Sequence, residues 1–223
     1  MFDAIAPRYD LLNRVLSAGI DRRWRARAIR SLQLTGRETL LDVCAGTADM
    51  ALEARATSGA ARVLGVDFAG AMLALGLAKV RAAGESDRIA LVRGDAMRLP
   101  VAAATADAVT VAFGIRNVQQ PAVACVEMAR VLRAGGRLAI LEFGVPRIPG
   151  ISTLYLWYFK YLLPLVGRAV SGHSAAYSYL PASVGTFPPP AAFMTILRQA
   201  GFTDVRADPL TFGIVYLYMA RKL

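Results

Sequence analysis

Two carboxylates stand 25 residues apart at the ends of apolar runs, and a turn of small residues follows the first. Asp42 lies near the end of the run 39–43 and precedes the turn 45–48, and Asp67 directly follows the run 63–66. Small side chains let the backbone approach a ligand closely, and a carboxylate after the second strand can accept hydrogen bonds from two adjacent ribose hydroxyls. The layout therefore predicts a strand–helix–strand unit that binds a nucleoside.

The composition of the turn narrows the choice of nucleoside. It contains one glycine, Gly46, followed by Thr47, whose hydroxyl can donate a hydrogen bond at the start of a helix. Cys44 and Ala48 stand where a dinucleotide turn needs glycine to admit a pyrophosphate. The turn therefore favours S-adenosylmethionine. A nicotinamide-dependent oxidoreductase and a tight turn without any ligand are the alternatives.

A third acid follows the next apolar run, in the sequence Gly94-Asp95-Ala96. Asp95 can accept a hydrogen bond from the exocyclic amine of adenine, while a backbone N–H beside it donates to a ring nitrogen. A plain turn would also explain Asp95, just as helix capping would also explain Asp67. Taken in order at successive strand ends, the three segments indicate a class I S-adenosylmethionine-dependent methyltransferase.

Apolar runs that alternate with helical segments must hold these residues in place. We expect strands at about 39–43, 61–66, 88–93, 107–113, 137–143, 203–208 and 211–219, and helices from about 47 and at 69–83, 119–132 and 189–200. Such alternation predicts a Rossmann-like α/β fold with a seven-stranded, mostly parallel sheet and helices on both faces. The segment 210–219 suits an edge hairpin.

The whole chain, 1–223, reads as a single domain with two additions. Residues 1–37 read as helical, because Ile20, Trp24, Ala28 and Leu32 repeat every four residues. Residues 146–190 are rich in proline and aromatic residues and read as an insertion that covers the acceptor site.

Composition limits the location and the partners. The chain has no apolar run of about 20 residues and no basic leader, so we expect neither a membrane-spanning helix nor a signal peptide. Both cysteines, Cys44 and Cys125, fall in expected core elements, which suits a reducing cytoplasm. The net charge is +10, and residues 1–37 hold eight Arg against three Asp. A nucleic-acid or membrane-surface binder is thus a third class, although no nucleic-acid motif is present.

Further motifs continue along nearly the whole chain, at 9–24, 113–117, 130–143, 177–183, 200–202 and 210–215. In these segments the chain resembles the menaquinone/ubiquinone biosynthesis C-methyltransferases. It departs from that family at Asp21, where His is usual, at Ala134, where Pro is usual, and at Ala45 and Ala48, where Gly is common.

The resemblance implies a site for each reactant. It places Gly46, Thr47, Asp67, Asp95, Ala96 and Ala112 at the S-adenosylmethionine, with no metal. It implies methyl transfer to a ring carbon of a polyprenylated quinol, giving menaquinone from demethylmenaquinol. The methoxy-polyprenyl-benzoquinol of ubiquinone synthesis, or another small phenol, is the alternative acceptor.

Four residues are expected to line the quinol pocket: Tyr9, Asp10, Tyr177 and Tyr179. Plain core packing is the alternative for the tyrosines. The lone His173 reads as a surface residue rather than a base. The aromatic stretch 154–166 could be an interfacial segment that admits a prenyl tail at the inner face of the membrane, a buried helix, or a homodimer contact.

The chemistry of methylating a quinol carbon points to Arg116 and Asn117, which follow the expected strand 107–113. A sulfonium is already a strong electrophile, so the protein must align the reactants, exclude water and make the ring electron-rich. Arg116 could stabilise a developing phenolate, and Asn117 could position the hydroxyl or a water. A turn held by hydrogen bonds is the alternative role for this pair.

Overall fold

The apolar runs form the seven strands of one sheet in a computed structural model that describes residues 17, 19–60, 62–146, 148, 150 and 183–223. The strands are β1 Thr39–Val43, β2 Arg62–Asp67, β3 Ile89–Arg93, β4 Ala106–Ala112, β5 Leu132–Phe143, β6 Phe202–Leu210 and β7 Val215–Lys222, in the order β3-β2-β1-β4-β5-β7-β6. Strands β1 to β5 pair in parallel, while β7 runs antiparallel between β5 and β6. The predicted fold class is confirmed.

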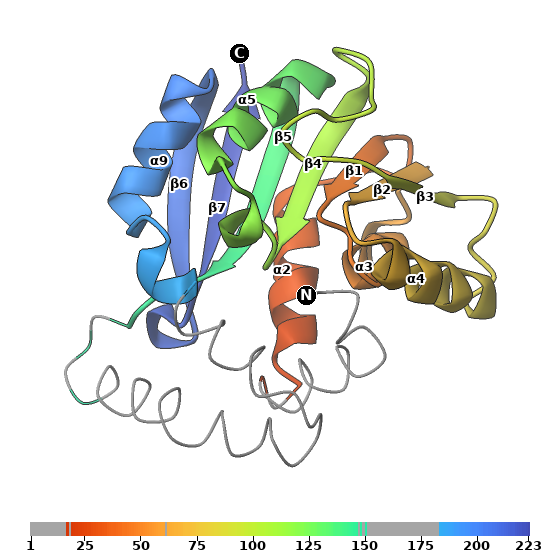
Figure 1. Cartoon of the computed structure of the whole chain (residues 1–223), viewed down its shortest axis with the longest axis horizontal. Helices are drawn as coiled ribbons and strands as arrows, with labels where there is room; N and C mark the ends of the chain where they lie inside the picture. Colours follow the sequence, from red (N-terminus) through yellow and green to blue (C-terminus); the bar gives the residue numbers. More distant parts are fainter. Residues whose placement is uncertain (1–16, 18, 61, 147, 149, 151–182) are drawn as a thin grey trace.

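Helices cover both faces of this sheet (Figure 1). They are α2 Asp21–Ser31, α3 Asp49–Ser58, α4 Gly70–Ala82, α5 Pro121–Val131 and α9 Pro190–Gln199. Successive strand residues point to opposite faces, so Leu40 packs in the core under α2 and α3, and Leu41 in the core under α5 and α9. Such near-continuous apolar strands are typical of a parallel sheet that is buried on both sides.

Helix α2, Asp21–Ser31, confirms part of the helical prediction for 1–37, whereas the described residues 32–37 are not helical. Trp24, Ala28 and Leu32 are buried, as their four-residue spacing predicts. Arg25 is also buried, which the spacing did not predict, because it forms an ion pair with Asp21 one turn earlier. This ion pair lies next to Asp49 of α3, which Arg25 also contacts.

Two strand boundaries differ from the expectation. Strand β5 begins at Leu132 rather than near 137, because it already pairs with β4 before a bulge. Ala106 faces Leu132, but Ala108 faces Arg137. Gly135 allows this with a φ of +73°. Strand β7 begins four residues late, since the short 3₁₀ helix Thr211–Gly213 makes the turn of the predicted hairpin.

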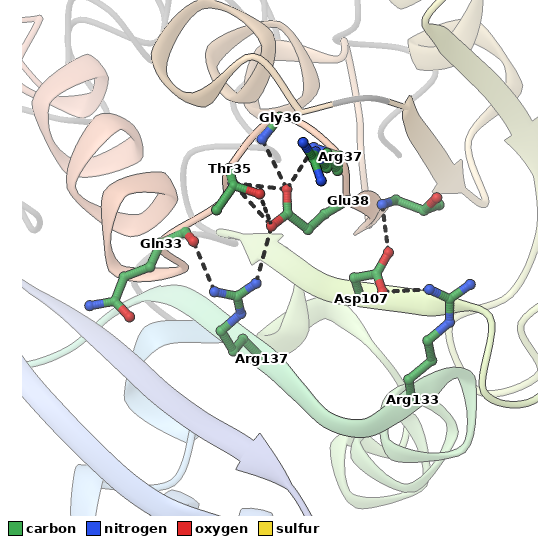
Figure 2. A network of polar contacts seen from close by, with 9 residues as sticks. Gln33, Thr35, Gly36, Arg37, Glu38, Asp107, Arg133 and Arg137 are labelled. Atoms are coloured by element: carbon green, nitrogen blue, oxygen red, sulfur yellow. Dashed lines mark hydrogen bonds and ion pairs between the residues drawn. The ribbon is translucent and has the colours of Figure 1, made fainter.

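A polar network fastens the amino ends of β1 and β4 (Figure 2). The Glu38 carboxylate accepts hydrogen bonds from the backbone N–H groups of Thr35, Gly36 and Arg37 at 2.9–3.0 Å, and Arg137 lies 3.6 Å away. Burial acts to raise the pKa of Glu38, but the hydrogen bonds outweigh it and lower the pKa to about 2.

Asp107 continues this network on β4. It accepts hydrogen bonds from the Thr39 N–H at 2.8 Å and from Arg133 at 2.6 Å. The amino ends of two adjacent strands are therefore held by carboxylates, which leaves their carboxyl ends to form a site.

Candidate cofactor and acceptor site

The strand order reverses between β1 and β4, since the chain runs from β1 outward to β3 and returns to β4. In open parallel sheets, ligands bind beyond the carboxyl ends of the strands at such a switch point. The backbones after β1 and β4 meet there at close range. A Cβ on Gly114 would lie 2.3 Å from the Cβ of Cys44, so only glycine fits.

The loop after β1 has an unusual backbone. Cys44, Gly46 and Ala48 have φ angles of +56°, +54° and +66°. Left-handed backbone costs roughly 1–2 kcal/mol for a residue with a side chain, so two of the three positions are strained. Their surroundings must hold the loop in this shape, and strain of this kind gathers at ligand-binding sites.

Asp67, at the end of β2, is the main brace of this loop. Its Oδ2 accepts a hydrogen bond from the Gly46 N–H at 2.8 Å, and its Oδ1 accepts one from the Ala69 N–H at 2.8 Å. The bond to Ala69 stabilises the turn before α4 and does not cap the helix, which has no side-chain cap. Each carboxylate oxygen has a second lone pair, so the geometry is compatible with ribose binding, which stays a prediction.

Thr47 sits in a chain of charged side chains that joins three helices. Lys79 of α4 donates a hydrogen bond to the Thr47 Oγ1 at 3.1 Å and forms an ion pair with Asp49 of α3. Asp49 lies 3.4 Å from Arg25, and Arg25 lies 2.5 Å from Asp21 on α2. Asp21, where the family usually has His, thus supplies the last carboxylate of this chain. A cavity of about 300 Å³ opens beside it, between α2, α3 and α4.

The two remaining predicted cofactor contacts follow β3 and end β4. Asp95 accepts a hydrogen bond from the Met97 N–H at 2.8 Å, so it stabilises a turn, and Ala96 is buried beside it. Ala112 is the last residue of β4. Contact of these residues with adenine or with the cofactor backbone stays a prediction.

Asp42 is the carboxyl group whose pKa is raised most among the described residues. It is 1% exposed, its Oδ1 accepts a hydrogen bond from the Thr110 hydroxyl at 2.9 Å, and its Oδ2 has no partner there. Burial, with a smaller contribution from the charge of Asp67, raises the pKa of Asp42 to about 7. A buried carboxyl oxygen without a partner is costly when it is charged, which is why the pKa is raised.

The acidic surroundings also affect the pKa of the Cys44 thiol. Desolvation raises its pKa, and nearby carboxylates raise it further. Those carboxylates are Asp67, Asp42, Glu142 and Asp95. Asp42 has a pKa of about 7 and Glu142 is paired with Arg116, so the negative charge near the loop comes mainly from Asp67 and Asp95. S-adenosylmethionine carries a positive sulfonium, so these surroundings fit it better than a dianionic pyrophosphate.

Arg116 and Asn117 lie in the 3₁₀ helix Ile115–Asn117 directly after β4. Arg116 is tightly held: its Nη1 is 2.6 Å from Glu142 Oε1 and 2.6 Å from the Phe113 carbonyl, and its Nε donates to Ser183 at 3.3 Å. The Asn117 amide donates a long hydrogen bond to the same Phe113 carbonyl at 3.4 Å. The turn-stabilising role is therefore present, and the catalytic role stays a prediction.

The structure brings several predicted residues together. Gly46, Thr47 and Asp67 lie around one loop, and Arg116 with Asn117 lies on the adjacent strand end. The predicted quinol-pocket residues Tyr9, Asp10, Tyr177 and Tyr179, together with His173 and the stretch 154–166, lie outside the described residues.

The sequence predicts no role for three charged residues of the site: Glu142, Lys79 and Arg25. Glu142 is an acid within an apolar run, and that pattern is the signal that could have identified it. Lys79 and Arg25 carry no comparable signal, because a basic residue on a helix is usually solvent-exposed.

Two negative findings apply to the described part of the chain. It contains no group of three or more side chains able to hold a metal ion. It also contains no helix that is long and apolar enough to cross a membrane.

Comparison with known proteins gives a consistent result. A model of the ubiE/COQ5 methyltransferase family matches residues 1–222. The chain is 49% identical over 218 residues to the ubiquinone/menaquinone biosynthesis C-methyltransferase UbiE of Syntrophotalea carbinolica. The matched residues cover 98% of this chain and 91% of that protein. It is 43% identical over 222 residues to the demethylmenaquinone methyltransferase of Thermus thermophilus, with 100% of both chains covered.

Solved structures agree on the fold. An S-adenosylmethionine-dependent methyltransferase from Aquifex aeolicus superposes with a TM-score of 0.63 at 17% identity and covers 89% of each chain. A likeness at this identity speaks to the fold alone.

Proposed function

The chain belongs to the ubiE/COQ5 methyltransferase family, and from that premise we propose that it transfers the methyl group of S-adenosylmethionine to a ring carbon of demethylmenaquinol. The choice of demethylmenaquinol as the acceptor rests on full-length similarity to a protein named demethylmenaquinone methyltransferase. Other relatives are named for both quinones, so methylation of the benzoquinol of ubiquinone synthesis is the second candidate.

The negative field around Cys44 supports the assignment of the methyl donor. When bound, S-adenosylmethionine supplies a methyl group on a positively charged sulfur. We propose that Asp67 holds the ribose, Asp95 and Ala96 hold the adenine, and Gly46, Thr47 and Ala112 contact the rest of the molecule. The carboxylates of Asp67 and Asp95 favour a cation over a neutral thioether, so they favour the donor over the demethylated product.

At the acceptor, we propose that Arg116 donates hydrogen bonds to the quinol oxygen as it loses its proton. Negative charge on that oxygen raises the electron density of the neighbouring ring carbon. A carbon–carbon bond then forms to the methyl group as the methyl–sulfur bond breaks with its electron pair on sulfur. The ring carbon passes its proton to solvent and the oxygen takes a proton back, which restores the quinol. Asn117 positions the hydroxyl or a water that accepts the first proton.

The rest of the acceptor site is proposed from the sequence. Tyr9, Asp10, Tyr177 and Tyr179 would form the walls around the quinol ring. The prenyl tail is apolar, so we propose a peripheral contact with the inner face of the membrane through 154–166. A homodimer contact through the same stretch is the alternative.

Transfer of radiolabelled methyl from S-adenosylmethionine tests this function. The acceptors are a short-chain demethylmenaquinol and a short-chain methoxy-benzoquinol, assayed side by side. We expect faster labelling of demethylmenaquinol. Labelling of the benzoquinol alone would select the second candidate, and tight NAD binding without binding of S-adenosylmethionine would overturn both.

The same assay separates the roles of two residues. Asp67→Ala should weaken cofactor binding, while Arg116→Ala should slow turnover and leave cofactor binding intact. Normal turnover of Arg116→Ala would show that Arg116 has no catalytic role.

A further inference from the structure

The carboxyl end of β5 places a fully buried carboxylate directly against Arg116. Glu142 is 0% exposed, and the side chain of Arg116 is 8% exposed. Glu142 Oε1 accepts hydrogen bonds from Arg116 Nη1 at 2.6 Å and from the Phe143 N–H at 2.8 Å. Its Oε2 accepts one from the backbone N–H of Arg116 at 3.2 Å. Both oxygens therefore hold the Arg116 segment or its neighbour in place.

The contacts of Arg116 leave one end of its guanidinium available. A guanidinium has five N–H donors. Nη1 donates to Glu142 and to the Phe113 carbonyl, and Nε donates to Ser183. Nη2 donates a hydrogen bond to none of the described residues. It is also not among the fully buried side-chain atoms of the described residues that lack a hydrogen-bond partner. Its two N–H groups are the pair that can reach a ligand.

The aromatic ring of Phe143 lies against the same guanidinium. The Arg116 Cζ lies 5.2 Å from the centre of that ring, which in turn lies 4.6 Å from the ring of Phe113. The ion pair, the carbonyl, the hydroxyl and the ring together restrict the orientation of the guanidinium.

We propose that Glu142 is the positioning residue of the acceptor site, which holds Arg116 so that the Nη2 donors face the quinol oxygen that develops negative charge. The inference rests on the proposed function, because it gives Arg116 that role. Glu142 acts through geometry: without it, a flexible arginine would spend part of its time in other rotamers. Pre-set donors need no reorganisation during the reaction, which is the source of their catalytic effect.

Three variants and one control test the proposal in methyl transfer to demethylmenaquinol: Glu142→Gln, Arg116→Met, the double variant, and Glu85→Gln. Gln retains the size of Glu142 but presents an N–H₂ group to one of its donors. Glu85 forms a comparable 2.7 Å pair with Arg55, away from the strand ends of the site. Calorimetry with S-adenosylmethionine verifies that each variant is folded and binds the cofactor.

We expect Glu142→Gln to lower kcat by about 10- to 100-fold, with the affinity for S-adenosylmethionine changed by less than about threefold. The apparent pKa of the kcat profile should rise by about one unit, because the quinol oxygen is less well stabilised as an anion. The double variant should be no slower than Arg116→Met, since Glu142 acts only through Arg116. Glu85→Gln should keep the parental kcat and pH profile.

Four results would overturn the proposal, and they are distinguishable. If Glu142→Gln has the parental kcat and pH profile while Arg116→Met is slow, the positioning role fails and the proposed function stands. The positioning role would also be rejected if the loss of kcat in the double variant equals the product of the losses in the two single variants. If Arg116→Met turns over normally, both the role of Arg116 and that of Glu142 are wrong. A parent protein that methylates neither quinol rejects the proposed function and this inference together.

Discussion

At the scale of single residues, the site depends on contacts too close to tolerate a change in size. Gly114 and Cys44 follow strands that are neighbours only in the folded sheet, and the Cβ of Cys44 lies where a Cβ on Gly114 would have to fit. This is the contact that joins the cofactor loop to the segment of Arg116.

Gly114→Ala should destabilise the protein by about 2 kcal/mol, because the new Cβ would lie 2.3 Å from Cys44. Chemical denaturation measures this loss. Gly70→Ala is the matched control: a Cβ there meets nothing within 4 Å at the start of α4, so stability should stay the same or rise. Equal stability of the two variants would contradict the close approach.

Asp42 should make the stability of the cofactor-free protein depend on pH. Its pKa rises from 3.8 to about 7 on folding, so between these values the folded protein binds a proton that the unfolded chain does not. The stability that this proton contributes is fully present below pH 3.8 and is lost as the pH rises through 7. Asp42→Asn should be more stable than the parent at pH 8, by on the order of 2 kcal/mol, with a smaller advantage at pH 5.

Denaturation in urea at the two pH values checks this expectation. In the Asp42→Asn variant, the Thr110 hydroxyl can still donate to the oxygen of the new side-chain amide, so that hydrogen bond is kept. A stability difference that is the same at pH 5 and pH 8 would show that Asp42 does not titrate in this range.

At the scale of the elements, the strands are fastened at their amino ends and left to carry function at their carboxyl ends. Glu38 and Asp107 tie β1 to its surroundings at one end (Figure 2). At the other end, Asp67 and Glu142 tie loops that hold the proposed binding and catalytic groups. The division lets the loops be strained without loss of the sheet.

Glu38→Gln should destabilise the protein at pH 7 by on the order of 2 kcal/mol, because an amide accepts these hydrogen bonds less strongly than a carboxylate. The pKa of Glu38 is lowered from 4.5 to about 2, so the stability it adds is present above pH 4.5 and lost as pH falls toward 2. Thermal unfolding of parent and variant should therefore converge as the pH falls from 5 to 3. A gap that is constant over that range would contradict the assignment.

At the scale of the whole molecule, cofactor binding should stabilise the fold, because the proposed contacts come from four neighbouring strand ends. At a concentration 100 times the dissociation constant, S-adenosylmethionine should add about 2.7 kcal/mol to the free energy of unfolding. A thermal shift assay measures this. Asp67→Ala should lose most of the shift at the same concentration, while Glu85→Gln should keep it. An undiminished shift for Asp67→Ala would place the cofactor elsewhere.

Most of the architecture was predictable because it depends on local patterns. Alternating apolar runs and helical segments indicate a parallel sheet, and the expected strands and helices are present within a few residues. The errors fall where distant segments set the outcome. The early start of β5 follows from its bulged pairing with β4, and the late start of β7 from a turn with Phe212 at a φ of +60°.

The sequence by itself determined the order of the elements, the acids at successive strand ends and, through its motifs, the family. Only the tertiary structure decided which charges meet. Arg116 and Glu142 are 26 residues apart, and Thr47 and Lys79 are 32 residues apart. Nothing in the spacing of such residues predicts a contact, because it arises when two strands or helices pack side by side. The buried state of Asp42 and Arg25 has the same origin, since burial depends on what the rest of the chain places over a residue.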